Sequence, residues 1–435
     1  MNQKSVAARM SRLLILPLAA VAFIPVLLTE LHFYTIHDLV GDAIPDTFIF
    51  EHGAQGFVEG HLPYGVHFLT APYSHVVFVY PPLSLLLVVP PLLAGAKYYS
   101  FGFAIEMLVL LGIGVWVLGG ACRRAGVLYP VALTAAALMI AVGPVLVTRV
   151  DGLQGLAVAG AALALRSRRI ALAVALVTLA ALIKETVVVA TIPIVLWALW
   201  PPVGKRWTEG LRQRAAQVGL GLVPAAAILL AFLVWSRGGV IGAAIASVHR
   251  GVEIESVAAS ISFLLHAFLP IASYTGTLGS VQLSGPQVSP AAAVVALVGV
   301  VALVWGTLHF VRERRRPVAA VAFAIAVTVA STPVLSPQYL LALLPVLVLA
   351  AGSEFSRSRA NLLLGSGFLM ALLTQIEFPD LFSQVVAFNP LVIAVVALRN
   401  LLLIAIAVNL ARADPGPAPE PELTPVIAPA GSPLA

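Results

Sequence analysis

The sequence predicts an all-α, polytopic membrane protein, and three observations support this fold class. Of the 435 residues, 60% are hydrophobic and only 10% are charged, and the mean hydropathy is +1.01. Apolar runs recur along the whole chain, and many approach the roughly 20 residues that a helix needs to cross the hydrocarbon core. These runs lack the period-two alternation of strands, which favours helices over a closed barrel.

The number of crossings follows from the basic residues, because Lys and Arg concentrate in cytoplasmic loops. The apolar segments lie near 12–31, 76–96, 99–121, 127–147, 152–165, 170–184, 186–200, 216–235, 290–311, 317–332, 338–352, 360–376 and 390–411. Three of them precede Arg123, so one cannot be a full crossing if both Arg123 and the N-terminus are cytoplasmic. We assign this role to 76–96, because its two proline pairs break a helix. The prediction is about twelve transmembrane helices plus one partial or re-entrant segment.

The chain is predicted to form one membrane domain, 1–411, followed by a tail, 412–435. The N-terminal apolar run resembles a signal peptide but lacks a clean cleavage site, so we expect it to remain as the first span. Two long polar loops, 32–75 and 236–289, are assigned to the outer side. The tail is rich in proline and is expected to be disordered and cytoplasmic.

Titratable groups concentrate in the first outer loop, where residues 30–75 contain six of the nine histidines and six of the nineteen acidic residues. Within 46–60, apolar residues recur at the spacing of one helix face, namely Phe50, Ala54, Phe57 and Val58. A different, polar stripe contains Glu51, Gln55 and Glu59. This pattern predicts an amphipathic helix on the outer membrane surface. Asp46 begins that helix, either as an N-cap or as a carboxylate that could act as a general base at the lipid–water boundary.

Further charged residues stand at the predicted ends of spans. Arg149 and Asp151 form either an ion pair that joins two helices or a site for a lipid-linked phosphate, which a guanidinium binds well. Lys184 admits the same two interpretations. Arg399 interrupts the last span, where helix packing and ligand binding both remain open.

No metal site is predicted. The histidines show no HExxH spacing, and the single Cys122 excludes a zinc site built from cysteines. We therefore expect neither a metal nor another cofactor.

The order of these motifs resembles GT-C glycosyltransferases, in particular glycosyltransferase family 87. The resemblance covers roughly residues 10–410 and rests on Asp46 with its short helix, Gly60-x-x-Pro63-Tyr64, Tyr80-Pro81-Pro82-Leu83, Arg149-x-Asp151, Lys184 and Ser336-Pro337-Gln338-Tyr339. It implies that Asp46 is the catalytic residue, and Phe50 stands where the family often has a tyrosine. Asp38 and Asp42 also lie close enough in the sequence to compete for the catalytic role. The substrate-binding residues that the resemblance implies are Tyr64, Tyr80, Arg149, Asp151, Lys184, Gln338 and Tyr339.

Family 87 includes polyprenyl-phosphate-mannose-dependent mannosyltransferases of actinobacterial envelopes. The resemblance implies an inverting hexosyltransferase of the bacterial cell membrane whose active site is extracytoplasmic. Such an enzyme moves a sugar, with mannose favoured, from a polyprenyl-phosphate donor to a glycolipid or glycan acceptor of the cell envelope. The expected partners are this donor, this acceptor and membrane lipids. Nucleic acid is not expected, because the formal charge of +6 comes from short basic loops.

Two other classes of function remain open. A polytopic transporter or lipid flippase is favoured by Arg399 and by the proline-rich spans. Transporters, however, tend to place charges at the bilayer midplane and to contain inverted repeats, whereas here most charges lie at span ends and no repeat is visible. The third class is a non-catalytic assembly partner.

Overall fold

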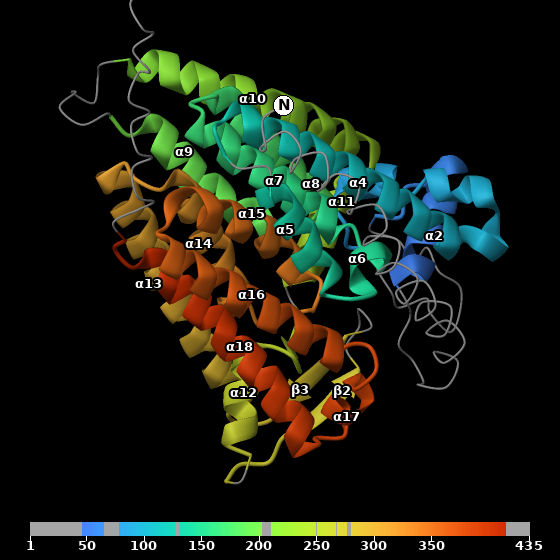
Figure 1. Cartoon of the computed structure of the whole chain (residues 1–435). Helices are drawn as coiled ribbons and strands as arrows, with labels where there is room; N and C mark the ends of the chain where they lie inside the picture. The colour runs from blue at the N-terminus through green and yellow to red at the C-terminus, as the bar shows by residue number, and fades with distance from the viewer. Residues whose placement is uncertain are drawn as a thin grey trace, which may run out of the picture.

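The computed structural model describes residues 46–64, 78–127, 130–201, 210–248, 250–266, 268–275 and 280–414. Helices dominate this part of the chain (Figure 1). The expected first span, the aspartates at 38 and 42 and most of the proline-rich tail lie outside the described residues.

Five helical segments among the described residues are long and apolar enough to cross a membrane. They correspond to α4 (Tyr99–Arg124), α10 (Leu211–Trp235), α13 (Val288–Glu313), α16 (Arg357–Glu377) and α18 (Pro390–Ala411). Only 22% of the most apolar window of α10, and the same share of α13, is buried within the protein. Their remaining apolar side chains face outward, where lipid would surround them.

Shorter apolar helices fill the interior. They are α5 (Pro130–Ile140), α7 (Asp151–Arg166), α8 (Ile170–Ile183), α9 (Thr191–Leu199), α14 (Pro317–Ser331) and α15 (Tyr339–Glu354). Helices α14 and α15 pack against each other, with α5 and α7 beside α15 and with α13 and α18 beside α14 (Figure 1). The predicted apolar segments from 99 onward are thus helical where the structure describes them, but these six fall below the length of a full crossing, so the predicted count of about twelve is not established.

The proline-rich segment 76–96 does not form one continuous helix. It contains α3 (Pro82–Leu87) and the 3-10 turns η2 (Pro90–Ala94) and η3 (Ala96–Tyr98). Within the segment, the ring of Tyr80 lies 4.7 Å from the ring of Phe50. The ring of Phe103 on α4, after the segment, lies 5.3 Å from the same Phe50 ring. That both ends of the segment lie on one side of the membrane stays a prediction, as does its depth in a bilayer.

The basic blocks at helix ends meet at the opposite end of the bundle. Arg166 pairs with Glu354 across 3.5 Å, and Arg316 donates a hydrogen bond of 2.8 Å to the carbonyl of Arg412. Helices that begin at this end, beside the basic blocks, end at the other end of the bundle, where the predicted site residues lie. The alternation of helix directions therefore agrees with the positions of the basic blocks.

The second polar loop is a small folded unit rather than an irregular connection. It contains α11 (Gly239–Val248), β1 (Val252–Glu253), α12 (Val257–Leu264), β2 (Ala272–Thr275) and β3 (Val281–Ser284). The strands form an antiparallel sheet in the order β1-β3-β2. The all-α prediction thus describes the bundle but misses this sheet.

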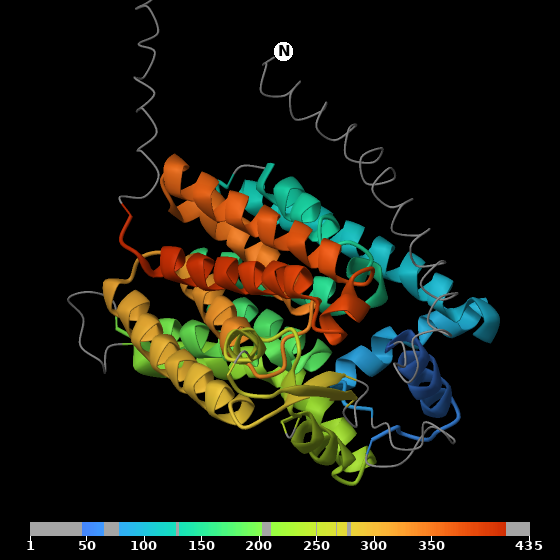
Figure 2. The same cartoon turned by 90° about the horizontal axis from the view of Figure 1, so that it is seen from below.

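A view from below shows α2 (Asp46–Val58) on the flank opposite α13 (Figure 2).

Candidate active site

Aromatic side chains hold α2 against the bundle. Phe50 is fully buried and packs between Tyr80 and Phe103. One residue before the end of α2, the ring of Phe57 stacks on that of Phe232 at 6.3 Å. The predicted apolar face of this helix is therefore confirmed, although Val58 at its end remains 63% exposed.

Asp46 begins α2, and its carboxylate reaches across to two other segments. The Tyr80 hydroxyl donates a short hydrogen bond to Oδ2 of Asp46. The same oxygen lies 2.8 Å from Nε of Arg149. Within the described part of the chain, both contacts lead away from the first turn of α2, so they give Asp46 more than the role of an N-cap.

The sequence left two interpretations of Arg149 and Asp151 open, an ion pair with each other or a phosphate site. In the structure Arg149 pairs with Asp46 and Asp151 pairs with Lys184, so the ion pair between Arg149 and Asp151 is not the one formed. Arg149 has an extended backbone after α6 (Val145–Thr148), whereas Asp151 is the first residue of α7. Asp151 is fully buried, and its carboxylate oxygens lie 3.3 Å from the Lys184 ammonium.

Lys184 lies between two tyrosine rings. Its ammonium is 5.5 Å from the ring centroid of Tyr80 and 4.8 Å from that of Tyr339. Gln154 on α7 donates a short hydrogen bond to the Lys184 carbonyl, which fixes the end of α8. The structure thus brings together the predicted residues Asp46, Tyr80, Arg149, Asp151, Lys184 and Tyr339.

The other two predicted residues lie next to this group. The Tyr64 hydroxyl donates to the Tyr80 carbonyl at 2.9 Å, so Tyr64 orients Tyr80. Oε1 of Gln338 accepts from the Ser336 hydroxyl at 2.8 Å. A direct contact of either residue with substrate stays a prediction.

Two residues of the site were missed. Arg250 pairs closely with Glu253 on β1. The charge of Asp46 acts on Arg250, and the charge of Lys184 acts on Glu253. Burial raises the pKa of Glu253, while the charges of Arg250 and Lys184 oppose that rise. The available signal was that three of the four charged residues in 236–289 lie between 250 and 255.

The three carboxylates of these ion pairs differ in accessibility. The side chain of Asp46 is 21% exposed, whereas those of Asp151 and Glu253 are 0% and 5% exposed. Asp46 is therefore the carboxylate that a substrate can reach. No group of three or more metal-ligating side chains is present among the described residues.

A model of glycosyltransferase family 87 matches residues 78–337, which is more than half of the chain. The chain belongs to glycosyltransferase family 87. This confirms the resemblance seen in the sequence and indicates a glycosyltransferase. No curated protein and no solved structure matches the chain.

The range matched by the family model includes most residues of the candidate active site of this family 87 protein. It contains Tyr80, Arg149, Lys184 and the missed Arg250, but it starts after Asp46. The role of Asp46 therefore depends on its ion pair with Arg149 and on its exposure.

Proposed function

We propose that this family 87 protein is an inverting, polyprenyl-phosphate-sugar-dependent hexosyltransferase, with mannose the favoured sugar. The acceptor is a glycolipid or glycan of a bacterial cell envelope, and the site faces the extracytoplasmic side of the cell membrane. The observation that supports this proposal best is the accessible carboxylate of Asp46, which pairs with Arg149 and accepts from Tyr80, the residue whose ring the Lys184 ammonium faces.

The reaction is one displacement at the anomeric carbon. Asp46 takes the proton of the acceptor hydroxyl, whose oxygen then forms the new bond to the anomeric carbon. The bond from that carbon to the phosphate oxygen breaks on the opposite face, and its electron pair leaves with polyprenyl phosphate. General-base catalysis of this kind contributes typically about 10²–10⁴-fold.

Cations stabilise the leaving phosphate. Arg149 donates through Nη1 to the Thr148 carbonyl at 3.1 Å, and its Nε lies 2.8 Å from Oδ2 of Asp46 in an ion pair, so the plane of the guanidinium is fixed on two sides. A planar guanidinium matches two phosphate oxygens. Lys184 adds a second charge, and low-dielectric surroundings strengthen both interactions.

The surface next to α2 suits a lipid-borne donor. Helix α2 contacts η2, where Leu93 is 94% exposed, and Val58 at the end of α2 is 63% exposed. Apolar side chains at such exposure favour contact with acyl or polyprenyl chains. The sugar would then reach Asp46 from the plane of the membrane.

A transfer assay tests the proposal. The purified full chain in nanodiscs is given a panel of polyprenyl-phosphate sugars with an envelope glycolipid extract, and the labelled product is separated and digested with anomer-specific glycosidases. We expect transfer from one donor with inversion at the anomeric carbon. Retention of configuration, or transfer only from nucleotide sugars, would contradict the proposal.

The charge of Arg399, which favoured the transporter or flippase alternative, has a structural explanation. Arg399 is 1% exposed and lies 2.7 Å from the carboxylate of Glu377, so an internal ion pair accounts for its charge. A flippase would move labelled lipid between leaflets without forming a new glycosidic bond. Scrambling of a fluorescent polyprenyl phosphate in the same nanodisc-derived vesicles, with no product formed, would favour that class.

A further inference from the structure

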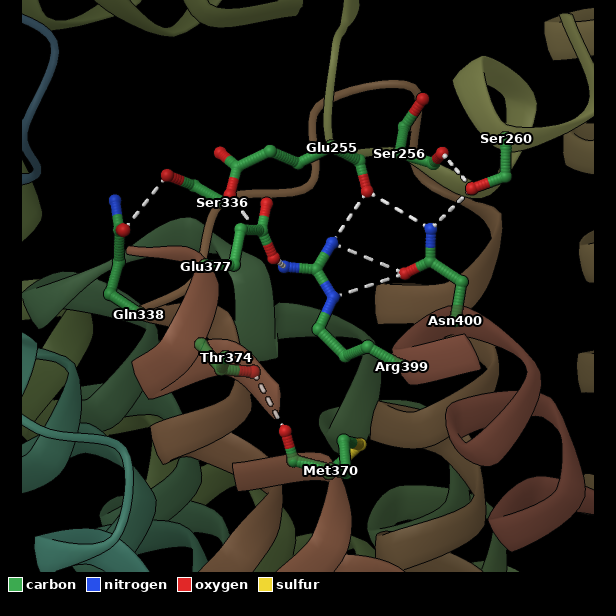
Figure 3. A network of polar contacts seen from close by, with 10 residues as sticks. All are labelled: Glu255, Ser256, Ser260, Ser336, Gln338, Met370, Thr374, Glu377, Arg399 and Asn400. Atoms are coloured by element: carbon green, nitrogen blue, oxygen red, sulfur yellow. Dashed lines mark hydrogen bonds and ion pairs between the residues drawn. The ribbon is translucent and has the colours of Figure 1, made fainter. Parts of the chain in front are cut away.

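A second buried polar centre lies in the middle of α18. Nη1 of Arg399 is 2.7 Å from Glu377, and its Nη2 donates to the backbone carbonyl of Glu255 at 2.6 Å. Asn400 donates to the same carbonyl at 3.1 Å. Figure 3 shows the guanidinium between Glu377 and the main chain at Glu255, with Asn400 beside it.

This centre fixes one end of the segment 250–255, which contains β1 and follows α11 in the second polar loop. Asn400 also donates to the hydroxyl of Ser260 at 2.9 Å. Ser256, between the two attachment points, caps α12 through a bond from the Ala259 amide at 3.0 Å. Two side chains of α18 therefore hold both the carbonyl of Glu255 and the first turn of α12.

The other end of the same segment faces the candidate active site. The Glu253 amide donates to the Pro333 carbonyl at 2.9 Å, and the Glu253 carboxylate pairs with Arg250. The chain passes close to β3 here, because a Cβ at Gly251 would clash with the Gln282 side chain. The position of Arg250 is therefore set by the backbone from 251 to 255.

One N–H donor of the Arg250 guanidinium lacks an acceptor among the described residues. Its Nη2 binds Glu253, whereas its Nε is buried and has no hydrogen-bond partner among the described residues. A buried guanidinium N–H without an acceptor is unfavourable, and an anionic oxygen would satisfy it. The proposed donor carries such oxygens.

The geometry points to Arg250 as a binding residue for the phosphate group of a polyprenyl phosphate, with Arg399 and Asn400 as positioning residues that hold it in place. This inference depends on the proposed function for the nature of the anion. Arg399 and Asn400 are 1% and 2% exposed, so they touch no substrate and act through the Glu255 carbonyl.

Binding of farnesyl phosphate to the full chain in detergent tests this inference, with farnesol as the probe that lacks the phosphate. Arg250→Ala should weaken binding of farnesyl phosphate about tenfold or more, the loss of a charge-assisted hydrogen bond, and leave farnesol binding unchanged. Unchanged affinity for farnesyl phosphate in this variant would overturn the assignment, as would a wild-type protein that does not bind it.

The positioning role is tested by combining variants. Arg399→Ala should also weaken farnesyl phosphate binding, and the double variant with Arg250→Ala should bind no more weakly than Arg250→Ala alone, because both changes remove the same contact. Effects that multiply would show that Arg399 acts elsewhere. If Arg399→Ala does not fold, Asn400→Ala, which keeps the ion pair, serves the same comparison.

Glu354→Gln is the matched control. Glu354 is a buried carboxylate at the opposite end of the bundle, where it accepts from the amides of Val318 and Ala319. This variant should lower the melting temperature without changing the affinity for farnesyl phosphate. If the wild-type protein binds farnesyl phosphate but transfers sugar from no donor, only the proposed function is refuted. The affinities of the variants for farnesyl phosphate, relative to the wild-type protein, would still decide the role of Arg250.

Discussion

Replacing Asp46 by Asn should abolish transfer while leaving the protein folded. An amide oxygen can still accept from the Tyr80 hydroxyl and from Arg149, whose side chain is 14% exposed, so the stability cost should be about 1–2 kcal/mol. Domains are typically stable by about 5–15 kcal/mol, so nearly all molecules stay native. The amide cannot take the hydroxyl proton, and turnover should fall by about 10²–10⁴-fold.

The measurements are kcat with a saturating polyprenyl-phosphate sugar, the melting temperature in detergent and the affinity for farnesyl phosphate. Glu51→Gln on the same helix is the control, because Glu51 is half-buried and accepts from Gln55 at 3.1 Å. Burial raises the pKa of Glu51, and a neutral glutamine should be tolerated there with normal turnover. Near-normal transfer by Asp46→Asn, with an inactive Asp38→Asn or Asp42→Asn, would refute the assignment of the base.

Three further outcomes are expected. Gly155→Ala should lower the melting temperature strongly, because a Cβ there meets the Leu341 carbonyl where α7 crosses α15. Gly112→Ala is the control and should not lower it, because nothing lies within 4 Å of a Cβ at that position. Equal melting temperatures of the two variants would contradict the close packing of α7 on α15. Lys184→Met should cost about 3–5 kcal/mol of unfolding free energy by leaving the buried Asp151 carboxylate unpaired, and adding Asp151→Asn should restore much of it. In a Cys122→Ser background, a cysteine at 55 should react with an impermeant maleimide added outside intact cells, and a cysteine at 314 should not. The reverse labelling would place the candidate active site on the cytoplasmic side.

The helices and most of the candidate site could be predicted because the signals are local. A run of apolar residues between charged blocks defines a helix without knowledge of its neighbours, and the helical spacing in 46–60 identified the buried Phe50. The motifs at 46, 80, 149 and 184 were grouped because alternating crossings place them at one end. The family match over 78–337 contains the motifs at 80, 149 and 184 and starts after the one at 46.

The partners within the site could not be predicted, because they depend on backbone direction over one or two residues. The extended conformation of Arg149 sends its side chain to Asp46 instead of Asp151. The sheet in the second polar loop has strands of two to four residues, too short for a periodicity. Arg250 was overlooked because its position depends on Arg399, a contact that is remote in sequence.

The sequence separations of these contacts also define an order of assembly during synthesis. The Tyr80–Asp46 contact spans 34 residues and the Lys184–Asp151 contact spans 33, so both can form while the ribosome is still making the second half of the chain. The bond from Arg399 to the Glu255 carbonyl spans 144 residues and must await α18, the final described helix. Contacts of long sequence separation form late. A nascent or truncated chain without α18 would thus carry the Tyr80–Asp46 hydrogen bond and the Lys184–Asp151 ion pair but an unanchored Arg250, so the site is completed only once α18 has been made.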